Sequence, residues 1–104
     1  MSDAQIAQQI LREWKDYGYR DDGVLVFDDE NGRYLLLSVG WDGQKRFHYV
    51  AVHLHLKDGK FFIEWDNTPE GVALDLERVG VPKNRIVLAF YPLEHRRHGD
   101  YAPQ

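Results

Sequence analysis

The sequence contains no cysteine among its 104 residues. This absence excludes structural disulfides, thiolate metal ligands and thiol catalysis. The sequence also lacks an apolar run close to the ~20 residues of a membrane-spanning helix, and it begins without the basic and apolar segments of a secretory signal. We therefore expect a cytoplasmic protein that has no contact with a membrane.

The sequence also contains fewer basic than acidic residues. Thirteen Lys and Arg stand against 17 Asp and Glu, which gives a net charge of −4. Proteins that bind nucleic acid through a dominant phosphate-neutralising surface carry the opposite sign. The acid-rich stretch 21–30 lacks the ligand spacing of a Ca²⁺ loop and is typical of solvated turns.

Hydrophobic residues are plentiful by comparison. They make up 43% of the chain and include three Trp, six Tyr and five Phe. A chain of this length corresponds to one domain, and it is long enough to bury a core without a disulfide or metal. We expect a single domain over residues 1–104.

A first helix is expected to begin at Ser2 or Asp3 and to end at Gly18. Its apolar positions recur at helical spacing: Ile6, Ile10, Trp14 and Tyr17. The segments 24–27, 33–41, 45–57 and 60–65 then read as strands. Short turns join them at Asn31-Gly32, Asp42-Gly43 and Asp58-Gly59, which are typical of β-hairpins. The centre of the chain is therefore predicted to be an antiparallel meander.

A second helix is predicted after the fourth strand. Thr68-Pro69-Glu70 supplies a hydroxyl cap, a proline at the first helical position and an acid in the first turn. An apolar stripe follows at Val72, Leu76 and Val79. Gly80 and Pro82 indicate the end of the helix, and 86–90 reads as a buried last strand. The predicted fold class is α+β, an antiparallel β-meander of about five strands with an N-terminal helix and this second helix.

The long strand 45–57 indicates which face of the sheet is buried. Side chains alternate between faces along a strand. The even positions from His48 to Leu56 are mostly aliphatic, and the odd positions from Phe47 to His55 are aromatic and polar. We expect the even face to pack on the helices and the odd face to contact solvent or a partner.

His53 and His55 are the only residues whose spacing suggests a metal. They share a strand face roughly 7 Å apart, a distance at which two imidazoles can bind one ion. A third ligand would have to come from Asp66, His95 or His98. The interpretation that we favour is a polar sheet face without metal, and a metal-dependent hydrolase is an alternative. No cofactor, catalytic set or enzymatic activity is expected.

The C-terminal segment carries the one cluster that is both basic and aromatic. Arg96-Arg97 has His95 and His98 around it and tyrosines near it. It is compatible with a solvated tail, a protein interface or a nucleic-acid contact. The predicted interaction surface combines this pair with residues of the strands: Trp41, Arg46, Phe47, Tyr49, His53, His55, Trp65, Arg96 and Arg97.

Three segments carry a family resemblance. They are Val39-Gly40-Trp41-Asp42-Gly43, Lys57-Asp58-Gly59-Lys60 and Gly80-Val81-Pro82-Lys83. With this order and spacing of turns, nearly the whole chain resembles the XisI family, the fdxN element excision controlling factors found largely in cyanobacteria. The segment Glu94–Ala102 departs from the pattern that we expect for the family tail.

The resemblance implies an accessory role without catalytic residues. It implies an XisI-like fold and a controlling factor for site-specific excision of a DNA element in heterocyst development. The implied partner is an XisH-like protein, itself similar to restriction endonucleases in fold, with a recombinase and DNA contacted only indirectly. An alternative is a direct DNA-binding accessory factor that uses Arg33, Lys45, Arg46 and Arg96-Arg97. A homo-oligomer is also compatible with an exposed aromatic face.

Overall fold

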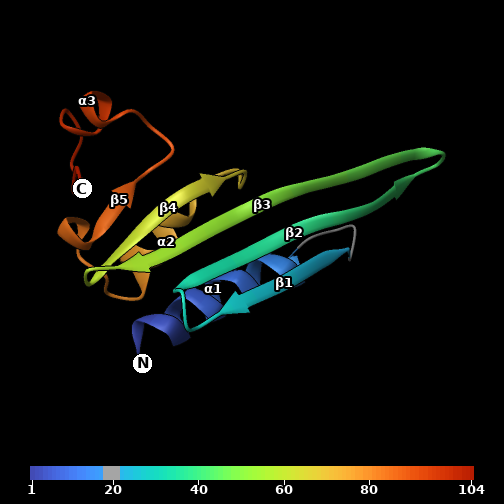
Figure 1. The fold of residues 1–104 in the computed structure, drawn as a ribbon, viewed down its shortest axis with the longest axis horizontal. Coiled ribbons are helices and arrows are strands. Elements are labelled where there is room, and N and C mark those ends of the chain that lie inside the picture. The colour runs from blue at the N-terminus through green and yellow to red at the C-terminus, as the bar shows by residue number, and fades with distance from the viewer. Residues whose placement is uncertain (18–21) are drawn as a thin grey trace.

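A sheet of five strands organises the part of the chain that the computed structural model describes, residues 1–17 and 22–104 (Figure 1). The elements in chain order are α1 (Asp3–Tyr17), β1 (Gly23–Asp28), β2 (Arg33–Asp42), β3 (Lys45–Lys57), β4 (Lys60–Asp66), α2 (Val72–Arg78), the 3₁₀ turn η1 (Lys83–Arg85), β5 (Ile86–Leu88) and α3 (Leu93–Arg96). The predicted helix end at Gly18 lies outside the described residues. None of the helices described is both long and apolar enough to cross a membrane.

Helix α1 begins with a reciprocal pair of hydrogen bonds. The Gln5 backbone N–H donates to Ser2 Oγ at 3.1 Å, and the Ser2 backbone N–H donates to Gln5 Oε1 at 2.8 Å. This capping box satisfies two backbone donors that the first turn leaves without partners. The predicted cap at Ser2 is therefore confirmed. The helix then buries Ala7, Ile10 and Leu11 against the sheet.

The sheet has the order β1-β2-β3-β4-β5 and is mixed. The first four strands form the predicted antiparallel meander. Strand β5 runs parallel to β4, so the prediction of a purely antiparallel sheet is wrong. The reason is that α2 lies between the two strands in sequence and carries the chain back along the sheet, and such a crossover joins parallel strands.

Helix α2 begins at Val72, later than the predicted start at Thr68-Pro69. The Asp66 carboxylate accepts hydrogen bonds from the Thr68 N–H at 2.9 Å, the Thr68 hydroxyl at 2.6 Å and the Val72 N–H at 2.7 Å. Asp66 thereby holds 66–72 as a loop. Gly71, with φ of +91°, is the N-cap residue.

The predicted end of α2 is confirmed, because Gly80 has φ of +99° directly after the C-cap residue Val79. Val79 does not belong to the buried stripe as predicted. It is 52% exposed, since the chain leaves the packed face of the helix at this position. The β2–β3 turn also differs from the prediction by one residue, because Gly43 and Gln44 join the strands and Asp42 remains in β2.

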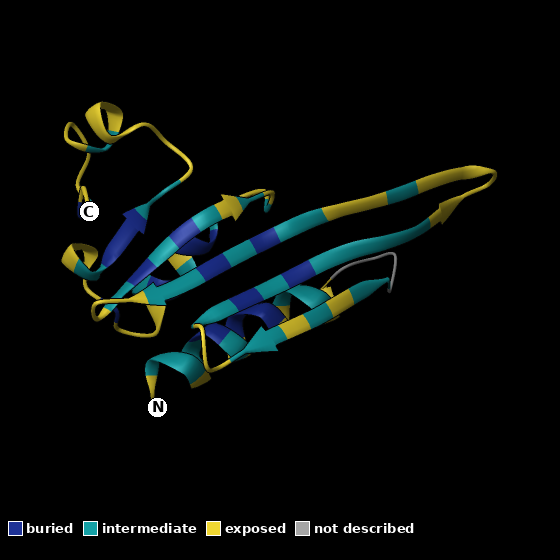
Figure 2. Cartoon of the chain, viewed as in Figure 1, coloured by how far each residue is buried: buried dark blue, intermediate teal, exposed yellow. Residues whose placement is uncertain are grey.

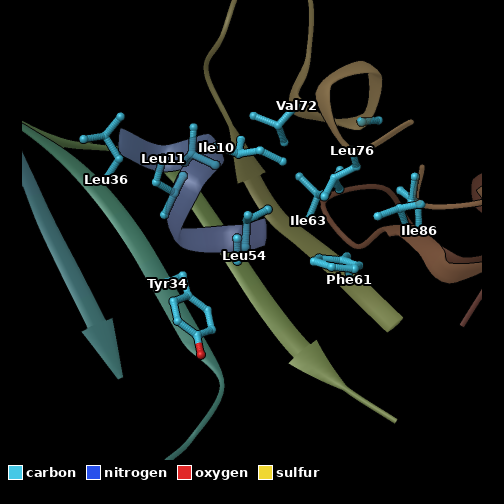
Figure 3. Packing of buried hydrophobic residues seen from close by; sticks show 14 residues of the cluster. Ile10, Leu11, Tyr34, Leu36, Leu54, Phe61, Ile63, Val72, Leu76 and Ile86 are labelled. Carbon is cyan, nitrogen blue, oxygen red and sulfur yellow. The ribbon is translucent and has the colours of Figure 1, made fainter. Parts of the chain in front are cut away.

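The hydrophobic core lies between the two helices and one face of the sheet (Figures 2 and 3). Its largest fully buried side chains are Ile10, Leu11, Tyr34, Val52, Leu54, Phe61, Ile63, Val72, Leu76, Ile86 and Val87. The Tyr34 hydroxyl donates to Asp29 Oδ1 at 2.6 Å, and burial raises the pKa of Tyr34 to about 12. In Figure 1, α1 and α2 both lie behind the sheet, so the opposite face has no helix over it.

A β-bulge at Ala51 reverses the faces of β3. Leu36 pairs with Val52 and Leu37 pairs with Val50, so Ala51 is an extra residue. On the C-terminal side of the bulge the even positions face the helices, as predicted. On its N-terminal side the odd positions face them instead. The prediction that one alternation holds along all of β3 is therefore wrong.

Strands β2 and β3 extend past their neighbours as a hairpin. Pairing with β1 reaches only Ser38, and pairing with β4 reaches only Val52. Residues 39–50, which we call the arm, therefore pair only with one another, apart from one hydrogen bond from the Val39 N–H to the Asp22 carbonyl at 3.1 Å. Figures 1 and 2 show the arm projecting with a largely exposed tip.

Substitutions at a buried and at an exposed leucine should differ in their effect on stability, and this difference tests where the core lies. Leu54 is fully buried, so Leu54→Ala is expected to lower the free energy of unfolding by about 2–5 kcal/mol through lost burial and a cavity. Chemical denaturation measures this loss. The matched variant Leu74→Ala, at an exposed position of α2, should change stability by no more than about 0.5 kcal/mol. Equal losses for the two variants would contradict the placement of the core.

Candidate interaction surfaces

The residues that the sequence predicted for one interaction surface lie on both sides of the sheet and in the C-terminal segment. Five lie on the side opposite the helices: Trp41, Arg46, His53, His55 and Trp65. Phe47 and Tyr49 lie on the helix side, where they line a pocket. Arg96 and Arg97 belong to α3 and the residue after it.

The side without helices forms a continuous surface that we call the open face. Residues paired directly across neighbouring strands point to the same side, so the register defines its members. They are Val24, Val26, Asp28, Arg33, Leu35, Leu37, Val39, Trp41, Arg46, His48, Val50, His53, His55, Lys57, Lys60, Phe62 and Trp65, together with Glu64, which contacts Arg33 and His55. An aliphatic block occupies its middle: Val24, Val26, Leu35, Leu37, Val39 and Val50.

At the tip of the arm, the open face carries a cation and an indole. The Arg46 guanidinium carbon lies 5.1 Å from the centroid of the Trp41 ring. Trp41 is 63% exposed, so its ring is available on the arm surface. A cation over an aromatic face is favourable, and it also shields part of the ring from water.

At the other end of the open face, Arg33 and Glu64 form a polar cluster with two histidines. Arg33 Nη1 lies 3.4 Å from His53 Nε2 and 3.8 Å from Glu64 Oε1, which is 3.8 Å from His55 Nδ1. Burial and the Arg33 charge lower the pKa of His53 and of His55, while Glu64 opposes this change. Both imidazoles are therefore mainly neutral at pH 7.

Among the described residues, none of the third ligands proposed for a metal site lies beside His53 and His55. Asp66 lies on the other side of the sheet, where it caps the loop before α2. His95 and His98 are in the C-terminal segment, beyond β5. Over residues 1–17 and 22–104, no group of three His, Cys, Asp or Glu could hold a metal ion.

On the helix side, a pocket of about 460 Å³ lies between the end of α1 and the arm. Four aromatic residues line it: Trp14, Tyr17, Phe47 and Tyr49. We call it the aromatic pocket. The Trp14 and Tyr17 rings meet edge to face at 5.4 Å, and the Phe47 and Tyr49 centroids are 6.5 Å apart. Tyr17 is 78% exposed and Tyr49 is 47% exposed, so a partner can reach both.

A second hollow of about 280 Å³ shares Trp14, Tyr17 and Pro69 with the aromatic pocket. The Trp14 indole N–H donates to Asp75 Oδ2 at 2.6 Å, which fixes the ring between the two hollows. Acidic side chains outnumber basic ones around them. The charged lining residues described are Glu13, Asp22, Asp42, Glu70 and Asp75 against Lys45 and Arg78.

Sequence reasoning missed Trp14 and Tyr17 as surface residues. They continue the helical stripe of Ile6 and Ile10, and this spacing predicts burial. They line a pocket because α1 extends beside the arm, where the sheet has only two strands. The apolar spacing in α1 does not indicate how far the arm extends, because strand pairing sets that length.

The C-terminal segment folds back onto the edge of the sheet. Ala102 bridges to Val87 of β5, and its N–H donates to the Ile86 carbonyl at 2.9 Å. Arg96 donates to the backbone carbonyls of Tyr91 at 2.8 Å and Pro103 at 2.9 Å. Arg96 therefore supports the fold of this segment, whereas Arg97 is exposed.

The histidine cluster gives a pH-dependent prediction. Since the folded chain lowers the pKa of His53 and His55, the unfolded chain takes up these protons first, and stability should fall as the pH drops below about 6.5. Arg33→Gln should raise both pKa values and Glu64→Gln should lower them further, as measured by NMR titration. Arg78→Gln, a charge-matched control, should leave both unchanged. A fall of either pKa in Arg33→Gln would contradict the assigned cause.

The comparisons with known proteins agree on one family. The chain matches the family described as "XisI protein" over residues 2–103. No curated protein matches the chain.

Two solved structures from Anabaena variabilis ATCC 29413 have the same fold. One is a XisI-like protein, with 27% identity and a TM-score of 0.89 over 95% of this chain and 94% of that one. The other is the fdxN element excision controlling factor XisI, with 27% identity and a TM-score of 0.81 over 97% of this chain and 95% of that one. The family match extends over almost all of the sequence, and this chain belongs to the XisI family.

Proposed function

We propose that this chain is an accessory factor in the excision or rearrangement of a DNA element, and that it acts in the cytoplasm by binding an XisH-like protein. One similar structure is that of an fdxN element excision controlling factor. The proposal assigns binding to this chain and leaves the DNA chemistry to other proteins. The aromatic pocket is the observation that carries it.

The aromatic pocket has the composition of a protein-binding site. Aromatic side chains contribute most of the binding energy in many protein interfaces, because they bury a large apolar area in few rotatable bonds. Here Tyr17 and Tyr49 project into solvent from two different elements, α1 and the arm. A side chain that entered between them would also contact Trp14 and Phe47.

Electrostatics favour a protein over DNA at this pocket. The described charged residues around the two hollows are mostly carboxylates, which repel phosphates and attract basic groups of a protein partner. Three of the basic residues that a DNA-binding function would use are engaged within the chain. Arg33 lies beside His53 and Glu64, Arg46 lies over Trp41, and Arg96 binds backbone carbonyls.

Affinity for an XisH-like partner tests the proposal. Tyr49→Ala is expected to weaken binding by more than about 1 kcal/mol, roughly fivefold, because an exposed aromatic anchor is lost. Isothermal titration with the purified partner measures this change. The control Tyr91→Ala, at a similarly exposed tyrosine of the C-terminal segment, should leave the affinity within twofold.

A pull-down from the native host distinguishes the DNA-binding alternative. Capture of an XisH-like protein that survives nuclease treatment is the expected result. Loss of that capture on nuclease treatment, together with DNA affinity that falls steeply with salt and with Arg97→Ala, would replace the proposal by direct DNA contact.

A further inference from the structure

Strand β1 forms one edge of the sheet. Among residues 1–17 and 22–104 it pairs with β2 alone, and no further strand lies beside it (Figure 1). Its residues, Gly23–Asp28, include no proline and no lysine, and their pairing with β2 contains no bulge. Proline, lysine and bulges are common devices that keep an edge strand from pairing with another chain. The backbone of β1 is therefore available on its outer side.

One hydrogen bond fixes which residues of β1 have their backbone groups on that outer side. The Val39 N–H donates to the Asp22 carbonyl at 3.1 Å. Asp22 and Val39 are the next pair after Gly23 and Ser38 in the register of β1 and β2. Hydrogen-bonded pairs alternate along an antiparallel ladder, so the even positions of β1 bond to β2 and the odd positions point away from it.

A second hydrogen bond gives the same result from the other side of β2. The Leu56 N–H donates to the Gly32 carbonyl at 2.8 Å, so the even positions of β2 before the bulge bond to β3 and the odd positions bond to β1. The register pairs these odd positions with the even positions of β1. Gly23, Leu25 and Phe27 therefore present their N–H donors and carbonyl acceptors at the outer edge.

On the open face, the edge carries two exposed valines. Val24 and Val26 are 44% and 42% exposed, and they pair with Leu37 and Leu35 of β2. A strand added at the edge places its own side chains directly across from them. Apolar side chains at these positions pack well against β-branched neighbours.

On the helix side, α1 places two cations beside the same edge. The Arg12 guanidinium carbon lies 5.2 Å from the centroid of the Phe27 ring. The Lys15 side chain lies over Gly23, where a Cβ would come within 2.8 Å of Lys15 Cγ. Glycine at this position therefore admits the lysine, and the two cations lie near opposite ends of the edge.

The described carboxylates nearest to these cations are directed elsewhere. Glu13 and Asp22 line the two hollows on the other side of α1. Asp28 accepts hydrogen bonds within the β1–β2 turn, and Asp29 accepts them from two other side chains. Asp16 is exposed on the side of α1 that faces away from the sheet. Among the described residues, the helix side of the edge is therefore locally cationic.

We propose that this edge binds an extended segment of another protein as an added antiparallel strand, with apolar side chains on the valine side and carboxylates beside the two cations. The backbone of the segment supplies partners for the donors and acceptors of the three outward residues. Main-chain hydrogen bonds provide affinity in this mode of recognition, and alternate side chains provide specificity. The site is separate from the aromatic pocket and does not depend on the function proposed for that pocket.

Charge favours such a segment over a second copy of this chain. If two β1 strands pair antiparallel and use all their outward residues, Leu25 lies opposite Leu25 of the other copy and Gly23 lies opposite Phe27. Lys15 of one copy then lies beside Arg12 of the other, at both ends of the pairing. Like charges opposed across an interface are costly. A strand that carries carboxylates at these positions meets opposite charges instead.

Amide hydrogen exchange of the full chain tests whether the edge is available. The Gly23, Leu25 and Phe27 amides should have protection factors at least about tenfold lower than those of Val24 and Val26, which donate to β2. Equal protection of the two sets would overturn the proposal, because the outer groups would already have partners. Protection of the outward amides that rises with protein concentration would also overturn it, since a second copy would then occupy the edge.

A capped synthetic peptide, Glu-Val-Thr-Val-Glu, is the probe for binding, followed by NMR titration of the full-length protein. Its valines face the valine side of the edge and its glutamates face the cations. N-methylation of both Glu and the Thr removes the donors that face β1 and should weaken binding by about tenfold or more. N-methylation of the two Val, whose N–H groups face away, should change affinity by no more than about twofold. Equal effects of the two modifications, or no shift of the outward amides at millimolar peptide, would overturn the proposal.

Charge reversal tests the side-chain selectivity. Replacing both glutamates of the peptide by lysines should weaken binding by about fivefold or more. The double variant Arg12→Glu, Lys15→Glu should reverse this preference, and Arg12→Glu alone, at an exposed position, should reduce it by at least about twofold. Arg78→Glu, at an exposed arginine of α2, should leave it unchanged. Circular dichroism checks that each variant is folded. A preference for glutamate that persists in the folded variants would refute the role of the two cations.

The edge and the proposed function can fail separately. Tyr49→Ala should leave the affinity for the peptide unchanged, because Tyr49 belongs to the aromatic pocket. Val26→Lys places a charge on the valine side and should weaken peptide binding by about fivefold, whereas Val79→Lys, at an exposed valine after α2, should not. Loss of peptide binding in Tyr49→Ala with no loss in Val26→Lys would place the peptide in the aromatic pocket and refute the edge site.

Discussion

The extra residue at Ala51 is the constraint on which the two surfaces of this protein depend. Without it, the even positions of β3 would all face the helices, and Phe47 and Tyr49 would share the open face with His53 and His55. With it, the aromatics of the arm turn towards α1 and form a pocket, while an aliphatic block continues on the other side. A single inserted residue thus gives one hairpin two chemically different faces.

Local signals in the sequence predicted the elements well. The hairpins, the Ser2 cap and the Gly80 stop each depend on a few adjacent residues, and the structure contains all of them, with the β2–β3 turn displaced by one residue. The predictions failed where residues distant in sequence determine the structure. Asp66 delays the start of α2, and the parallel pairing of β5 follows from the crossover through that helix.

The candidate surfaces were predictable by residue type but not by side. Exposed aromatic and basic residues were identified from their alternation along β3, which is a local property. Their division between two faces depends on the bulge in the pairing with β2, and bulges leave no reliable mark in a single sequence. Trp14 and Tyr17 were not predicted as surface residues for a related reason, since their exposure depends on how far the arm extends past β1.

The two edges of the sheet differ in their capacity to accept another strand. At β5 the returning C-terminal segment occupies the edge, with Ala102 bridged to Val87 and its N–H bonded to the Ile86 carbonyl. Arg96 anchors that segment through backbone carbonyls on both sides of it. An exposed strand edge is a template for uncontrolled growth of sheets between molecules. The C-terminal segment therefore blocks the addition of a further strand at the β5 edge, whereas β1, which pairs only with β2 among the described strands, keeps its outer edge open.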